Sequence, residues 1–131
     1  MLWEFLKEKM LSRPSSKMQE EDANITYEEA VIFAESFGKK LRTPCCAILC
    51  QSELAAALAL LSCFAAGVTA VPLSFRYGEA HCKRILRKIR PSAMITDVGG
   101  ELRVLHLDIA EKKQGTLEEW PAAILCTSGT T

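Results

Sequence analysis

The residues best suited to chemistry are a tract of hydroxyls around one glycine, Thr127-Ser128-Gly129-Thr130-Thr131. They directly follow the short apolar run Ala122–Cys126, which predicts a buried strand leading into a loop. Gly129 lets the backbone approach a ligand closely, and N–H and O–H groups donate to anions. Because ligands of open α/β sheets lie outside the carboxyl ends of strands, this loop suits phosphate. It lacks the lysine of the G-x-x-x-x-G-K-[ST] loop, and a disordered tail is the alternative.

The cysteines and histidines do not form a metal-binding pattern. None of the six cysteines is part of a C-x-x-C pair, and neither His81 nor His106 lies at zinc-finger spacing from a pair. Most of the cysteines lie in apolar runs, where a free thiol behaves as a small apolar group. The first residues, Met1–Glu4, do not resemble a signal peptide. We therefore expect a cytoplasmic protein with reduced cysteines; a disulfide scaffold is the alternative.

The length and the net charge of the chain argue against some classes of function. The 131 residues are enough for one domain, and 49% hydrophobic with 24% charged residues is an ordinary globular composition. The formal charge is zero, from 16 basic and 16 acidic side chains. This balance argues against a nucleic-acid partner and against binding to an anionic membrane.

One segment is strongly basic. Five cations fall within eight residues: Lys83, Arg84, Arg87, Lys88 and Arg90. They could form a phosphate-binding or nucleic-acid-binding stripe, or a solvated helix face whose cations are favoured near the helix C-terminus. We favour the solvated face, since no aromatic side chains are interleaved for base stacking.

Two helices are expected to begin the chain. Apolar residues between Leu2 and Leu11 have helical spacing, and the helix should end near Arg13-Pro14. The polar stretch 14–24 is predicted to be a connecting loop. A second helix should start at Thr26, with Glu29 as its capping-box partner, and run to about Leu41.

The remainder alternates between strands and helices. Strands are expected at 45–50, 68–73, 93–96, 102–108 and 122–126, with helices at 54–66 and 79–89. Gly67 should cap the first of these helices and Pro91 should end the second. The apolar helix 54–66 is too short to span a bilayer, so we expect it to be buried on most sides. The alternation predicts an α/β fold with a mainly parallel sheet and flanking helices.

In this order the segments resemble the beginning of an adenylate-forming (AMP-binding) enzyme. This superfamily includes acyl-CoA synthetases, luciferases and the adenylation domains of nonribosomal peptide synthetases. Residues 25–29, Ile-Thr-Tyr-Glu-Glu, are similar to the family's L-T-Y-x-E-L helix start. Residues 64–73 resemble L-K-A-G-x-x-x-V-P-L, residues 84–97 the Y-I-L…L-I-T-D passage, and residues 124–131 the first half of Y-T-S-G-T-T-G-x-P-K-G.

The resemblance implies ATP-dependent activation of a carboxylic acid. An acyl-adenylate and pyrophosphate would form with the help of Mg²⁺, and coenzyme A or a carrier-protein phosphopantetheine would accept the acyl group. By this resemblance, Thr127, Ser128, Gly129, Thr130 and Thr131 hold the ATP phosphates. The resemblance implies that the family's catalytic and metal-binding residues follow the signature, so we assign no catalytic and no metal-binding residue within 1–131.

Two hypotheses about function, from different classes, therefore remain. The first is one partial domain, 1–131, of an acid-activating ligase: an N-terminal helix and loop (1–24) and an α/β portion (25–131) ending in the phosphate loop. We expect it to be inactive alone, and to need either the remainder of the enzyme, in cis or in trans, or self-association to stay soluble. The second is a stand-alone, non-catalytic module that binds a nucleotide or a protein; a plain α/β scaffold is a weaker third. The sequence names neither the acid nor the acceptor.

Overall fold

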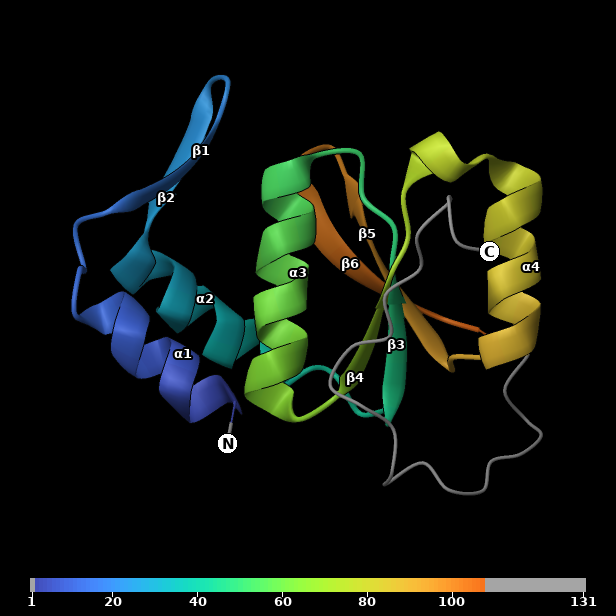
Figure 1. Ribbon diagram of the computed structural model, residues 1–131, viewed down its shortest axis with the longest axis horizontal. Coiled ribbons are helices and arrows are strands. Elements are labelled where there is room, and N and C mark those ends of the chain that lie inside the picture. Colours follow the sequence, from blue (N-terminus) through green and yellow to red (C-terminus); the bar gives the residue numbers. More distant parts are fainter. Residues whose placement is uncertain (1, 108–131) are drawn as a thin grey trace.

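A four-stranded sheet organises the part of the chain that the computed structural model describes, residues 2–107. Its strand order is β4-β3-β5-β6 (Figure 1). Strand β3 (Cys45–Ile48) lies centrally and pairs in parallel with β4 (Thr69–Pro72) and with β5 (Ala93–Val98). Strand β6 (Glu101–His106) pairs antiparallel with β5 after a turn at Gly99 and Gly100. The predicted α/β fold with a mainly parallel sheet is confirmed.

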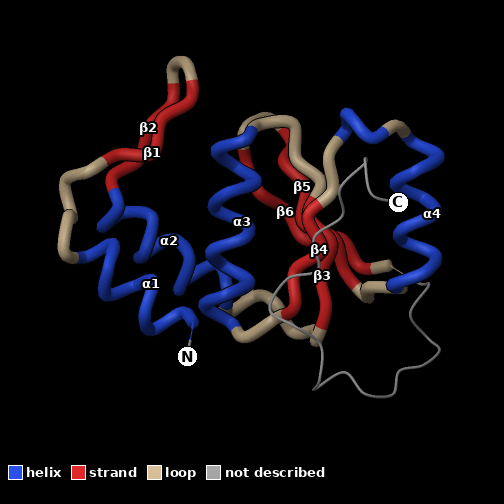
Figure 2. The backbone as a smooth tube through the Cα atoms, viewed as in Figure 1, coloured by secondary structure: helices blue, strands red, loops and turns tan. Residues whose placement is uncertain are grey.

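Helices cover both faces of this sheet (Figure 2). Helix α3 (Glu53–Ala66) connects β3 to β4 on one face, and α4 (Glu79–Ile89) connects β4 to β5 on the other. A short 3-10 turn, η1 (Phe75–Tyr77), precedes α4. Helices α1 (Leu2–Leu11) and α2 (Tyr27–Gly38) pack outside α3. Helix α3 therefore lies between two layers, which explains why its sequence is apolar on nearly every side.

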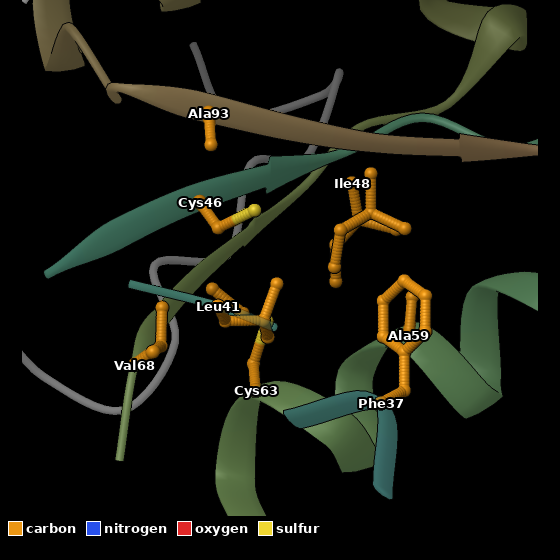
Figure 3. Close-up of a cluster of buried hydrophobic side chains, with 10 residues drawn as sticks. Phe37, Leu41, Cys46, Ile48, Ala59, Cys63, Val68 and Ala93 are labelled. Carbon is orange, nitrogen blue, oxygen red and sulfur yellow. The ribbon is translucent and has the colours of Figure 1, made fainter. Parts of the chain in front are cut away.

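The alternation of side chains along β3 divides the core between the two faces. Cys46 and Ile48 point toward α2 and α3, where they pack with Phe37 and Cys63 (Figure 3). Cys45 and Ala47 point the other way, toward α4. All four residues of β3 are buried, as expected of a central parallel strand with helices on both sides.

The predicted helix signals are present. Thr26 caps α2 through a capping box with Glu29: the Glu29 N–H donates to Thr26 Oγ1 at 3.1 Å, and the Thr26 N–H donates to Glu29 Oε1 at 3.0 Å. Gly67 ends α3 in the left-handed conformation, with φ of +72°. Helix α2 ends at Gly38, three residues before the predicted end at Leu41. Leu41 still packs in the core, but it lies in the turn that follows α2. Its burial there explains why it matched the apolar pattern of the helix.

The prediction for residues 14–24 was wrong in part. Instead of a plain loop, β1 (Lys17–Glu20) and β2 (Ala23–Thr26) form an antiparallel hairpin, with Met18 opposite Ile25. This hairpin projects away from the sheet (Figure 1). Its residues are mostly polar and half-exposed, so no period-two apolar pattern marked it. The backbone hydrogen bonds of the ladder hold it together instead.

Helix α1 is fastened to α2 by one carboxylate. The Trp3 indole Nε1–H donates to Glu35 Oε2 at 3.0 Å, and Lys7 Nζ lies 2.8 Å from the same oxygen. Trp3 is buried against Val31 and Ala34 of α2.

Within residues 2–107, no helix is both long and apolar enough to cross a membrane.

Candidate functional site

The predicted phosphate loop, Thr127 to Thr131, and the strand predicted before it lie outside the described residues. The described sheet nevertheless shows where a ligand would be expected on topological grounds. The connection after β3 leads to a helix on one face, and that after β4 leads to a helix on the other, so the order β4-β3-β5 contains a switch point. In doubly wound sheets, ligands bind at the carboxyl ends of the strands beside such a point.

Carboxylate side chains of the protein itself lie beside this switch point. Asp97, near the end of β5, accepts hydrogen bonds from the N–H groups of Gln51 (2.8 Å) and Ser52 (3.1 Å). Glu20, at the end of β1, accepts from Ser52 Oγ at 2.5 Å and from the N–H groups of Glu53 (3.0 Å) and Leu54 (3.2 Å). Two acidic side chains from distant parts of the sequence therefore meet at the N-terminus of α3.

No backbone donor is left free at this helix end. Ser52 caps α3, since its Oγ accepts from the Ala55 N–H at 3.1 Å, and the Ala56 N–H donates to the Ser52 carbonyl. Every N–H from Gln51 to Ala56 thus has an acceptor within the protein. The helix N-terminus, which would otherwise attract an anion, is already neutralised.

The electrostatics beside this helix end disfavour a polyphosphate. A pocket of about 380 Å³ is lined by Glu20, Glu21, Asp22, Ala23, Gln51 and Ser52. The hydrogen bond from the Ser52 hydroxyl, followed by those from the Glu53 and Leu54 N–H groups, lowers the pKa of Glu20 below its ordinary value. The carboxylate is therefore ionised at neutral pH. A pocket lined by three acidic residues does not suit ATP phosphates, so the phosphate site stays a prediction on Thr127–Thr131.

The cysteines in the described residues are placed as core groups and not as nucleophiles. Cys45, Cys46, Cys63 and Cys82 are buried, and Cys50 is half-buried; all five are free thiols. Burial raises the pKa of Cys45 to about 12, with a smaller contribution from Cys46. Burial and then the Asp97 charge raise the pKa of Cys50 to about 12. Thiols held this far from ionisation are poor nucleophiles and poor metal ligands.

No metal centre was found in residues 2–107: they contain no group of three or more His, Cys, Asp or Glu side chains able to hold an ion. A second pocket, of about 430 Å³, lies between the start of α1 and the end of α3, lined largely by apolar residues. Neither pocket brings together an acid, a base and a nucleophile.

Sequence reasoning missed the two carboxylates at α3. Ser52 could have been identified as an N-cap from its place before an apolar helix, and Asp97 from its place at the end of a strand. Their contact joins β5 to the loop after β3 across 45 residues of sequence. Glu20 gave no signal, because its role depends on the hairpin that brings it there.

The comparison with protein families tests the resemblance that the sequence motifs suggested. The family described as AMP-binding enzyme matches residues 6–131, nearly the whole chain. The chain belongs to the AMP-binding enzyme family. The expected resemblance to adenylate-forming enzymes is thereby confirmed. No curated protein matches the sequence.

Several solved structures share the fold of this chain. The crystal structure of IdnL1 superposes with a TM-score of 0.67 at 16% identity, covering 92% of this chain and 30% of that one. A fatty acid AMP ligase from Legionella pneumophila gives 0.57 at 22% identity, over 72% of this chain and 19% of the ligase. O-succinylbenzoate coenzyme A synthetase (MenE) from Bacillus subtilis, in complex with AMP, gives 0.55 at 22% identity, over 72% and 26%. The chain therefore spans less than a third of the length of these three structures.

Proposed function

We propose that this chain is part of an ATP-dependent ligase that activates a carboxylic acid as its acyl-adenylate. The carboxylate oxygen would attack the α-phosphorus of ATP, and pyrophosphate would leave. The observation that carries the proposal is the family match over residues 6–131, which includes the hydroxyl-rich tract. Adenylate formation is also in keeping with the structural neighbours, which include a fatty acid AMP ligase and a coenzyme A synthetase bound to AMP.

Within this proposal, Thr127, Ser128, Gly129, Thr130 and Thr131 hold the β- and γ-phosphates of ATP. Small side chains leave room for the phosphates, and fixed N–H and O–H donors stabilise the charge that develops on them. At the start of α3, by contrast, the backbone N–H groups from Gln51 to Ala56 already have acceptors within the protein. Mg²⁺ would accompany ATP, and coenzyme A or a phosphopantetheine thiol would accept the acyl group.

We further propose that the chain contributes one face of the site and does not form the adenylate alone. The rest of the enzyme, in cis or in trans, would supply the remaining groups. This proposal predicts that the 131-residue chain shows no exchange of labelled pyrophosphate into ATP with a panel of carboxylic acids. Exchange catalysed by the purified chain would overturn it and would mean that all the needed groups are present.

The phosphate assignment is tested by ³¹P NMR of ATP, pyrophosphate and AMP with the chain. If the chain holds the β- and γ-phosphates, it broadens those resonances of ATP and the signal of pyrophosphate, and leaves AMP unaffected. Ser128→Ala should reduce the broadening, and Ser15→Ala, at an exposed position near the other end of the chain, should not. Equal broadening of AMP and ATP would overturn the assignment, and so would an equal effect of the two variants.

A nucleotide-binding module without catalysis is the alternative. It predicts submillimolar ATP affinity in the isolated chain and no turnover after the missing part of the enzyme is supplied. The ligase proposal predicts weak affinity alone and exchange activity on complementation, so a complementation assay distinguishes the two.

A further inference from the structure

The outward side of α4 carries a concentrated positive charge. Lys83, Arg84, Arg87 and Lys88, which we call the basic face, are all exposed on this helix. The opposite side is apolar and packs on the sheet through Cys82, Ile85, Leu86 and Ile89. In Figure 1, no other described helix or strand lies on the outer side of α4. Among residues 2–107, no helix or strand therefore covers the basic face (Figure 1).

Within residues 2–107, the charges on this face are nearly uncompensated. The only acidic residue of α4 is Glu79, whose carboxylate lies 3.1 Å from Lys83 Nζ. Arg84 contacts the His81 ring, at 3.1 Å from Nδ1, which supplies no negative charge. Among residues 2–107, no ion pair involves Arg84, Arg87 or Lys88. By contrast, Lys7 of α1 is paired with Glu35.

This arrangement disfavours the isolated helix. Lys83 with Arg87, and Arg84 with Lys88, are like-charged pairs four residues apart, and each such pair destabilises a helix. The helix dipole favours cations only in the last turn, where Arg87 and Lys88 lie, so it does not account for Lys83 and Arg84. An anionic partner would remove the repulsion along the whole face.

The geometry restricts the kind of anion. The basic face extends for about 8 Å along the helix axis, at 1.5 Å per residue, which is small for a nucleic-acid duplex. It contains no aromatic side chain for base stacking, and the whole chain has no net positive charge. The apolar side of α4 is used in the core, so the helix cannot insert into a lipid surface. These features favour a protein partner.

We propose that the basic face docks an acidic helical segment of a partner protein. A helix with Glu or Asp at positions i, i+1, i+4 and i+5 carries two rows of carboxylates with the same axial repeat as the cations of α4. The two arginines can each bind a carboxylate through two parallel hydrogen bonds, which fixes the register of the partner. The proposal is independent of the ATP site.

The test uses the 131-residue chain and a fluorescein-labelled helical peptide with Glu at those four positions, followed by fluorescence anisotropy at low salt. The double variant Arg87→Gln/Lys88→Gln should weaken binding about fivefold, in line with the loss of two exposed ion pairs. The control, Arg13→Gln/Lys17→Gln, removes one arginine and one lysine at exposed positions near α1 and should change the Kd less than twofold. Raising the salt should weaken binding to the unaltered chain.

Three results would overturn the proposal. The first is equal weakening by the two double variants, which would show that only net charge matters. The second is unchanged binding in Arg87→Gln/Lys88→Gln. The third is tighter binding to phosphatidylserine vesicles or to a 20-nucleotide single-stranded DNA than to the peptide. Circular dichroism of each variant checks that the fold is retained; if Arg87→Gln/Lys88→Gln alters it, Lys83→Gln/Arg84→Gln takes its place in the comparison.

Discussion

The Asp97 carboxylate accepts a hydrogen bond from the Ser52 N–H at 3.1 Å, and so joins the end of β5 to the first residue before α3. The neighbouring Gln51 N–H donates to the other carboxylate oxygen at 2.8 Å. This contact fixes the loop that leaves the central strand β3. It also occupies the place where many doubly wound sheets receive a ligand. In this chain, the loop after β3 is held by a side chain of the neighbouring strand β5.

Asp97→Ala should therefore destabilise the fold. The substitution leaves two backbone N–H groups of a half-buried loop without their acceptor, and we expect a loss of about 1–3 kcal/mol in the free energy of unfolding. Asp97→Asn, which keeps one acceptor oxygen, should lose less. Urea denaturation followed by circular dichroism measures both. Glu101→Ala, at an exposed position on β6, is the control and should change stability by less than about 0.5 kcal/mol.

Glu20 should make the stability depend on pH. Its pKa is lowered in the folded chain, chiefly by the hydrogen bond from the Ser52 hydroxyl. A carboxyl group with a lowered folded-state pKa stabilises the fold above its unfolded-state pKa and loses this contribution as the pH falls through the folded-state pKa. The loss should begin near pH 4, about the unfolded-state pKa of glutamate, and continue below it.

The measurement is the urea midpoint between pH 7 and pH 2.5. Glu20→Gln should lower the midpoint at pH 7 and flatten its fall with acid. Glu21→Gln, which alters the adjacent exposed carboxyl, should leave the profile as in the parent chain. A profile for Glu20→Gln as steep as that of the parent would contradict the role given to Glu20.

Local signals in the sequence predicted most of the elements correctly. The capping box at Thr26 and Glu29 marked the start of α2, and Gly67 marked the end of α3, because each depends only on residues within one helical turn. Helix α4 was predicted with its observed bounds, since its apolar and charged residues separate cleanly onto two sides. The alternation of these elements was enough to predict the parallel sheet.

Contacts between distant segments could not be predicted in this way. The β1–β2 hairpin carries no apolar alternation, and Glu20 reaches α3 only because that hairpin forms. The full occupation of the N–H groups before and at the start of α3 follows from this contact and from Asp97, whose partner Ser52 lies 45 residues away in the sequence. For the candidate site, the family motif on Thr127–Thr131 was visible in the sequence. Its geometry lies outside the described residues.

Gly38→Ala should lower stability although Gly38 is the last residue of a helix. In an ordinary helical position, alanine in place of glycine stabilises by roughly 0.5–1 kcal/mol. Here a Cβ atom would lie 2.9 Å from the Ser62 carbonyl oxygen and 3.4 Å from the Ala66 Cβ, because α2 and α3 approach closely at this point. The oxygen belongs to the backbone of α3 and cannot move without shifting the helix.

We therefore expect Gly38→Ala to cost about 1–3 kcal/mol, the usual range for overpacking. Ser36→Ala, on the exposed side of the same helix, should be neutral or slightly stabilising. Thermal and urea denaturation of the two variants give the sign directly. A gain in stability for Gly38→Ala would mean that the two helices separate more easily than their packing indicates.

Cys45 and Cys50 should react slowly in the folded chain, for causes that can be separated. The pKa of each thiol is raised to about 12, by burial and Cys46 for Cys45, and by burial and Asp97 for Cys50. At pH 8 only about one thiol in ten thousand would then be ionised, and the thiolate is the reactive form. Iodoacetamide labelling, quantified by mass spectrometry, should be at least about a hundredfold slower at both residues than in urea.

Asp97→Asn removes the charge next to Cys50, so it should speed labelling of Cys50 and leave Cys45 unchanged. Equal acceleration at both cysteines would instead show that the substitution opens the sheet as a whole.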